Sequence, residues 1–132
     1  MDIVVAIDRS PESRNALISA LEIVESVGGR VIAVHVETGD ESRRPATLLE
    51  DASERAEERG VIFERTVLSG DPIDVIPQYA ADEGADAIYL GHRGLSHSGD
   101  EFSGESRGRL GSVAKGIVEK SAIPVTVFDR GL

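Results

Sequence analysis

Apolar residues along the chain alternate between two periods. Short runs of nearly continuous apolar character are typical of strands that are covered on both faces. We expect strands at residues 3–7, 31–36, 61–68, 87–90 and 124–128. The segments between them carry apolar residues at helical spacing, as in the stripe from Leu17 through Ala20, Leu21 and Val24 to Val27. The pattern therefore predicts strands and helices in strict alternation.

Residues that start and stop helices support this division. Ser10 and Pro11 suit the N-cap and the first position of a helix, and Gly28-Gly29 suits its end. Gly60 and Gly84 are expected to end the next two helices. Pro77 lies inside the third helical segment, where it is expected to disturb the hydrogen-bond ladder.

Alternation of this kind is typical of an α/β fold with a parallel, doubly wound sheet and helices on both faces. We expect one domain over residues 1–132, with five parallel strands in the order 2-1-3-4-5 or 3-2-1-4-5. The run at 61–68 is the least continuously apolar, which favours an edge position. Ligands bind such sheets at the carboxyl ends of the strands, where the winding reverses. In the order 3-2-1-4-5 the loops at that point are Asp8–Ser10 and Gly91–Gly94.

Composition narrows the functional classes. The chain of 132 residues has 24 acidic and 14 basic residues, a net charge of −10, which argues against nucleic-acid and anionic-membrane partners. It has no cysteine and no apolar run long enough for a membrane span, so we expect a soluble cytoplasmic protein. Lys115 and Lys120 are the only lysines among the basic residues. Few lysines with many acids suggest a salt-adapted, halophilic surface, although an ordinary acidic protein is the alternative.

Candidate chemistry gathers in three loops. Asp8 follows the first strand directly, and its carboxylate can either bind ribose hydroxyls or a cation, or cap the first helix. Glycines at Gly91 and Gly94 permit positive φ and close approach of a ligand to the backbone. Gly111-Ser112 opens the last helix, where backbone N–H groups favour an anion. Together these features suggest a phosphate cradle that lacks a P-loop lysine.

Catalysis and metal binding have weaker support. No nucleophile and base stand at a spacing that demands catalysis, so we expect no enzyme, or at most slow hydrolysis of a bound phosphate compound. His92 and His97 are read as solvated loop residues, because a metal site needs three or more converging ligands. His35 is read as a strand histidine whose hydrogen bonds are satisfied.

Five short motifs together resemble the universal stress protein family, in its single-domain form. They are Asp8-x-Ser10, Gly70-x-Pro72, Gly91-x-x-Gly94, Leu110–Ala114 and Ile123–Val125. The resemblance extends over the whole chain and implies the strand order 3-2-1-4-5. It also implies a stress-response regulatory protein that binds an adenine nucleotide.

The site and partner are likewise implied by the resemblance. In the ATP-binding branch of the family, Gly91, Gly94, Gly111 and Ser112 would line the triphosphate, with the Val113 amide as a further donor. Asp8 would hold adenine or ribose, and the backbone of Val34 would touch adenine. Apart from the resemblance, the charge of Arg93 suits a grip on phosphate, with pairing to the acids of the same loop as the alternative. The cofactor would be ATP, with or without Mg²⁺. A homodimer would form through the last strand, at Val125, Thr126, Val127 and Phe128.

One departure from the family pattern bears on the ligand. Between Gly94 and Gly111 lie sixteen residues rather than nine, which we read as an insertion within 95–109. Its cost in loop-closure entropy is small, about 0.5 kcal/mol. It brings Asp100, Glu101 and Glu105 towards the expected phosphate crevice. The alternative function is therefore a non-nucleotide interaction protein of the same fold, in which the insertion fills the site.

Overall fold

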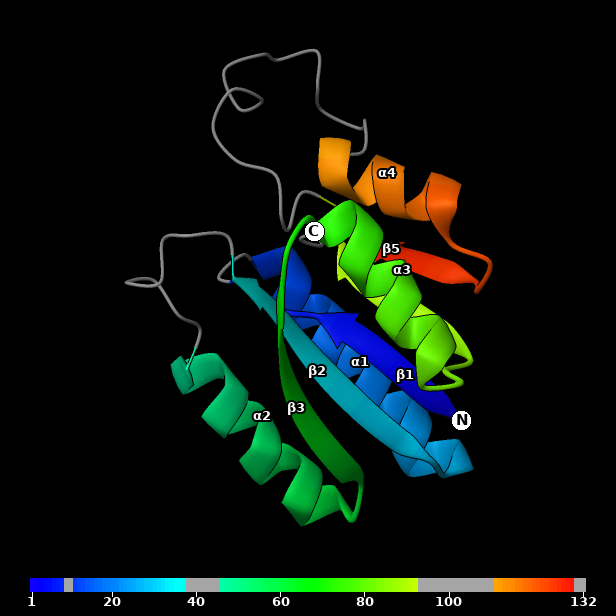
Figure 1. Cartoon of the computed structure of the whole chain (residues 1–132). Coiled ribbons are helices and arrows are strands. Elements are labelled where there is room, and N and C mark those ends of the chain that lie inside the picture. Colours follow the sequence, from blue (N-terminus) through cyan, green and yellow to red (C-terminus); the bar gives the residue numbers. More distant parts are fainter. Residues whose placement is uncertain (9–10, 38–45, 93–110, 130–132) are drawn as a thin grey trace.

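The computed structural model describes residues 1–8, 11–37, 46–92 and 111–129 (Figure 1). Strands and helices alternate throughout these residues, as the apolar pattern predicts. The strands are β1 (Asp2–Ala6), β2 (Arg30–Glu37), β3 (Ile62–Ser69), β4 (Ala87–Gly91) and β5 (Val125–Phe128). The helices are α1 (Pro11–Val27), α2 (Ala46–Arg59), α3 (Pro72–Asp82) and α4 (Ser112–Lys120).

The strands form one parallel sheet in the order β3-β2-β1-β4-β5. This confirms the predicted α/β class and the order implied by the family resemblance, and it excludes the order 2-1-3-4-5. It also confirms that the strand of mixed polarity, β3, lies at an edge. β5 forms the other edge, and the winding reverses between β1 and β4, which are neighbours in the sheet.

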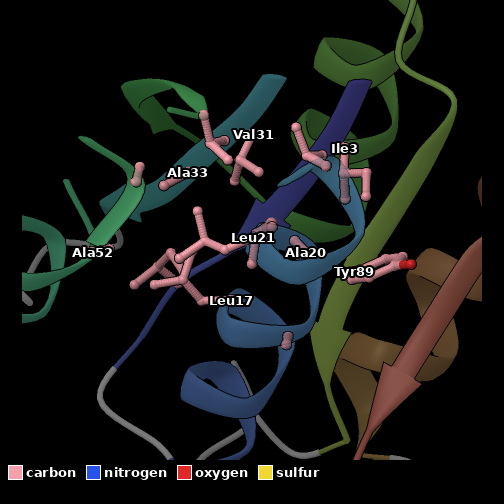
Figure 2. Close-up of a cluster of buried hydrophobic side chains, with 14 of the residues drawn as sticks. Ile3, Leu17, Ala20, Leu21, Val31, Ala33, Ala52 and Tyr89 are labelled. Carbon is pink, nitrogen blue, oxygen red and sulfur yellow. The ribbon is translucent and has the colours of Figure 1, made fainter. Parts of the chain in front are cut away.

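Each face of the sheet has its own core. Ile3 and Val5 of β1, and Ile7 directly after it, project towards α1 and α2. There Leu17, Leu21 and Ala52 complete a buried cluster (Figure 2). Val4 and Ala6 project to the other face, where the core residues of α3 and α4 include Ile76 and Ile117. Because β1 is buried on both faces, its sequence is continuously apolar.

The expected helix boundaries hold to within a few residues. Gly28 and Gly60 follow α1 and α2 with φ of +88° and +71°, a conformation that favours glycine. The Asp71 carboxylate accepts a hydrogen bond of 3.0 Å from the Ile73 amide at the start of α3, and Pro77 lies inside that helix. The expected N-cap at Ser10 lies outside the described residues.

An ion cluster at the amino ends of the strands joins four segments. Arg30 of β2 binds Asp2 of β1 at 3.1 Å, Glu64 of β3 at 2.9 Å and Glu83 after α3 at 3.4 Å. The hydrogen bond that Arg30 donates to the Asp2 carboxylate is the largest cause that raises the pKa of Arg30 above its ordinary value, and the charges of the three carboxylates add to it. The cluster fixes the end of the sheet opposite the carboxyl-end loops.

None of the four helices, within the residues the structure describes, is long and apolar enough to cross a membrane.

Candidate functional site

The pairing of β1 with β4 brings the first two candidate loops together. Ile3 lies opposite Ala87 and Val5 opposite Tyr89. Extended by two residues, this register sets Ile7 beside Gly91, so Asp8 leaves the sheet next to the end of β4 (Figure 1). The carboxyl ends of two adjacent strands thus meet where the topology favours a ligand.

A serine fixes the backbone of Asp8. The Asp8 amide donates to Ser13 Oγ at 3.0 Å, and the Ser13 hydroxyl donates back to the Asp8 carbonyl at 3.1 Å. Ser13 is fully buried on α1 and Asp8 is half-buried. Reasoning from the sequence missed Ser13. The available signal was a serine in the buried stripe of α1, three residues before Ala16.

Gly91 is required by packing and not by its backbone angle. It is absent from the positive-φ glycines of the described chain, so the positive φ that glycine permits is not used at this position. A Cβ at this position would lie 2.7 Å from the Glu12 Cβ and 3.1 Å from the Ser13 amide nitrogen. The first turn of α1 therefore crosses the end of β4 at a distance that only glycine permits.

The start of α4 lies against the same end of the sheet. The Gly111 amide donates to the His92 carbonyl at 3.0 Å, directly after β4. Gly111 is the N-cap in extended conformation and provides no side-chain hydrogen bond, while Ser112 is exposed. The first-turn N–H groups of an α-helix have no partner within the helix, and its dipole favours negative charge. Ser112 and Val113 thus present N–H donors suited to an anion, while the Gly111 amide is engaged by the His92 carbonyl.

Val34 lies in the middle of β2, beside the end of β1. Its carbonyl accepts a 2.8 Å hydrogen bond from the Ile7 amide, and its side chain is 1% exposed in the core under α3 and α4. Any ligand contact at Val34 must therefore involve its backbone, next to the residue that precedes Asp8.

His92 connects the site with the edge strand. Its amide donates to the Phe128 carbonyl at 2.6 Å, and its carbonyl accepts from Gly111. Phe128 also packs on Tyr89, with the ring centroids 5.0 Å apart. One peptide segment thus joins the end of β4 to both β5 and the start of α4.

Some expected features are not brought into the site. Arg93, Gly94 and the 95–109 insertion lie outside the described residues. The expectation that His35 is satisfied was wrong in one respect, because its buried Nδ1 has no hydrogen-bond partner in the described chain. Nor do the described residues contain a group of three His, Asp or Glu side chains that could hold a metal ion.

Comparison with known proteins agrees with the fold. The model of the universal stress protein family matches residues 1–129. Universal stress protein YxiE of Bacillus subtilis (strain 168) is 34% identical over 80 residues, which are 61% of this chain and 49% of YxiE. The matched region thus spans about half the length of that relative.

Solved structures resemble the chain over nearly its full length. A universal stress protein in complex with cAMP superposes with a TM-score of 0.75 at 24% identity, covering 99% of this chain and 98% of the other. The universal stress protein of Archaeoglobus fulgidus in complex with dAMP superposes with a TM-score of 0.73 at 26% identity, covering 97% of both chains.

Proposed function

Because the chain belongs to the universal stress protein family, we propose that it is a cytoplasmic regulatory protein of the stress response that binds ATP and acts as a homodimer. The observation that carries the nucleotide proposal is the start of α4. No side chain caps its amides in the described chain, and the Gly111 amide at its N-cap is hydrogen-bonded to the His92 carbonyl, directly after β4 and beside the end of β1. An anion placed there is stabilised by the N–H groups and by the helix dipole.

The proposed roles follow the order of the elements. The amides of Ser112 and Val113 bind phosphate, Gly111 lines the phosphate side with its backbone, and the Ser112 hydroxyl adds a further donor. Gly91, Gly94 and Arg93 complete the phosphate side. Asp8, held by Ser13, accepts hydrogen bonds from ribose or adenine, and the backbone of Val34 contacts the base. Any Mg²⁺ would arrive with the nucleotide, since Mg²⁺ commonly binds one or two carboxylates together with phosphate oxygens.

The dAMP complex of the Archaeoglobus fulgidus protein supports an adenine nucleotide as the ligand class. Thermal unfolding with ATP, AMP, cAMP and GTP tests this for the present chain. A ligand at 100 times its Kd stabilises the folded state by about 2.7 kcal/mol, which raises the Tm of a domain of this size by roughly 8–13 °C. We expect adenine nucleotides to raise the Tm and GTP to raise it much less. A shift below a degree with every nucleotide would contradict the proposal and favour the interaction-protein alternative.

Replacement of Ser112 by aspartate tests the phosphate position directly. The helix dipole stabilises a carboxylate in the first turn of α4, so the unliganded protein should keep or slightly gain stability. The same charge repels phosphate, so we expect ATP binding to fall by more than tenfold in calorimetric titration. Ser26→Asp, exposed at the far end of α1, adds the same charge and is expected to bind ATP normally. Equal affinities in the two variants would place the phosphates elsewhere.

The homodimer proposal is supported by the outer edge of β5. β5 ends the sheet, so one edge of its backbone has no neighbouring strand within the described chain. The Pro124 and Phe128 carbonyls both face β4, because they accept from Ile88 and His92. Backbone groups alternate along a strand, so those of Val125 and Val127 face outward, where a second copy can pair.

Val127→Pro tests this interface. Proline removes only an outward-facing N–H, and edge strands tolerate it there. We expect sedimentation velocity to show a dimer for the native chain and a folded monomer for the variant. Thr126→Ser, whose backbone groups face β4, is the matched control and should remain dimeric. A variant that stays dimeric with native circular dichroism would exclude pairing through β5.

A further inference from the structure

Both lysines of the chain lie on α4, and their surroundings differ. Lys120, at the end of the helix, binds Asp74 of α3. Lys115 lies near the start of α4 and is exposed. Within the residues that the structure describes it has no ion pair, although Glu119 follows it by one helical turn. Because the proposed phosphate position has no P-loop lysine, we asked whether Lys115 can supply a positive charge there.

Lys115 lies one helical turn from the amides that are proposed to bind phosphate. Its own amide donates to the Gly111 carbonyl at 2.9 Å, which closes the first turn of α4. The amides of Ser112 and Val113 precede that bond and have no partner within the helix. Ser112 and Lys115 are both exposed and three residues apart, so they are neighbours on the helix surface. Because Cβ atoms tilt towards the N-terminus of a helix, the long stem of Lys115 can reach back to the first turn.

The charges at the start of α4 differ from those of two other helices. The first turns of α1 and α3 contain Glu12 and Asp74, and the helix dipole favours acids at this end. The first turn of α4 has no acidic residue, and its N-cap is Gly111. A cation near this end of a helix is on the unfavourable side of the dipole. A bound anion would interact favourably with both the dipole and the Lys115 ammonium.

The direction of the proposed nucleotide determines which of its phosphates Lys115 can meet. Its base and ribose are proposed to lie at Val34 and Asp8, and its phosphates lead from there to the start of α4. The amides of Ser112 and Val113 bind the first phosphate that reaches the helix. A further phosphate extends past these amides to the exposed side of α4, on which Lys115 lies.

We propose that Lys115 binds the phosphates beyond the first and so makes the site selective for nucleoside di- and triphosphates over monophosphates. This inference rests on the proposed nucleotide function. The lysine ammonium is a compact charge with three donors, which suits phosphate oxygens. The P-loop lysine also contacts the outer phosphates of a nucleotide, but it comes from the loop before its helix.

Lysine-selective labelling follows this residue directly. A full chain labelled with ¹³C only in lysine gives side-chain signals from Lys115 and Lys120 alone, and Lys115→Arg assigns them. We expect ATP to shift the Lys115 signal saturably and to leave the Lys120 signal nearly unchanged. Saturating AMP should shift the Lys115 signal much less. Inorganic tripolyphosphate should shift it as well, which tests the phosphate contact without the base.

Variants measure the selectivity by calorimetric titration. Lys115→Gln should raise the Kd for ATP about fivefold, the typical effect of losing one exposed ionic contact, and change the Kd for AMP by less than about twofold. Lys115→Arg keeps the charge and should restore most of the ATP affinity. Lys120→Gln removes the same charge from the far end of the same helix, and this matched control should leave the Kd for ATP within about twofold.

Two results would overturn the role of Lys115 and leave the proposed function standing. One is a Lys115 signal that does not move in a chain saturated with ATP. The other is a rise of the Kd in Lys115→Gln that is equal for ATP and AMP, since that would show no preference for the outer phosphates. If neither ATP nor AMP binds the native chain, the proposed function fails, and the selectivity fails with it.

Discussion

At the scale of single residues, one hydroxyl sets the loop that carries Asp8. Ser13 both accepts from and donates to the Asp8 backbone, so Ser13→Ala leaves an amide and a carbonyl without that partner. We expect the free energy of unfolding to fall by about 1–3 kcal/mol. Because the loop loses its anchor, ATP affinity in calorimetry should fall as well, although Ser13 does not touch the proposed ligand.

Ser121 offers a matched control for this prediction. Its hydroxyl donates to the Ile123 carbonyl at 2.7 Å and accepts from the Ile123 amide at 3.0 Å, the same arrangement at the far end of α4. Ser121→Ala should reduce stability but leave ATP affinity unchanged. If both variants change affinity alike, the effect of Ser13 comes from lost stability and not from the position of Asp8.

Gly91→Ala tests the close contact between β4 and α1. The added methyl group would lie 2.7 Å from the Glu12 Cβ, so α1 must shift. Overpacking of this kind costs about 1–3 kcal/mol, which urea unfolding will measure. A loss below about 0.5 kcal/mol would show that the first turn of α1 moves freely.

Single residues also show which parts of the candidate site the sequence could predict and which it could not. Asp8, Gly91 and Ser112 were found because each follows a strand or opens a helix, and such positions are visible in a pattern. Ser13 was missed because the only signal was a serine in the buried stripe of α1, and its partner, the Asp8 backbone, cannot be identified from the sequence. The packing role of Gly91 was not foreseen either, because the close contact between α1 and β4 depends on tertiary structure.

At the scale of elements, α3 and α4 are joined by packing and by charge. Gly116 of α4 lies against Ile73 of α3, where a Cβ would come within 2.6 Å of the isoleucine Cδ1. Lys120 binds Asp74 across the same pair of helices. The hydrogen bond that Lys120 donates to the Asp74 carboxylate raises the pKa of Lys120 above its ordinary value of 10.5.

The sign of this shift gives a pH prediction. The folded state favours the protonated amine, so the stabilising contribution is present below pH 10.5 and is lost as the pH rises through the raised pKa. Lys120→Met should therefore lower the urea midpoint at pH 7, and the difference from the native chain should shrink above pH 11. Lys115→Met, which removes the other lysine, is the control. A difference between Lys120→Met and the native chain that persists unchanged at high pH would assign the effect to packing of the lysine stem.

The elements themselves were predictable from apolar periodicity. All five strands and four helices were expected in the correct order, because buried strands and amphipathic helices differ in period. Their ends shifted by a residue or two, as at β2, which runs from Arg30 to Glu37 rather than from 31 to 36. Arg30 extends β2 because its side chain is held by three carboxylates, and no local pattern reports such long-range pairing.

At the scale of the whole molecule, the strand order could not be chosen from the pattern alone. Two orders satisfy the same alternation, and only the family resemblance selected 3-2-1-4-5, which the structure confirms. The meeting of Asp8 with Gly91 follows from that order, because β1 and β4 are neighbours only when the winding reverses between them.

Net charge is a property of the whole molecule and leads to a salt prediction. A charge of −10 destabilises the folded state by self-repulsion, and at about 1 M salt the Debye length falls to roughly 3 Å. We expect the Tm to rise with KCl concentration between 0.1 and 1 M. A variant in which the exposed glutamates Glu50, Glu54, Glu57 and Glu58 of α2 become glutamines should show a smaller rise. An equal rise in both chains would point to preferential exclusion of salt and not to screening.

The two hydrogen bonds of His92 have a thermodynamic consequence for the molecule as a whole. The His92 amide donates to the Phe128 carbonyl at the end of β5, and the His92 carbonyl accepts from the Gly111 amide at the N-cap of α4. One peptide segment therefore connects the two places where binding is proposed. If nucleotide binding strengthens subunit association by a given factor, subunit association strengthens nucleotide binding by the same factor. Dilution should then release both the second subunit and the ligand, so that the cellular concentration of this protein would itself adjust its sensitivity to adenylates.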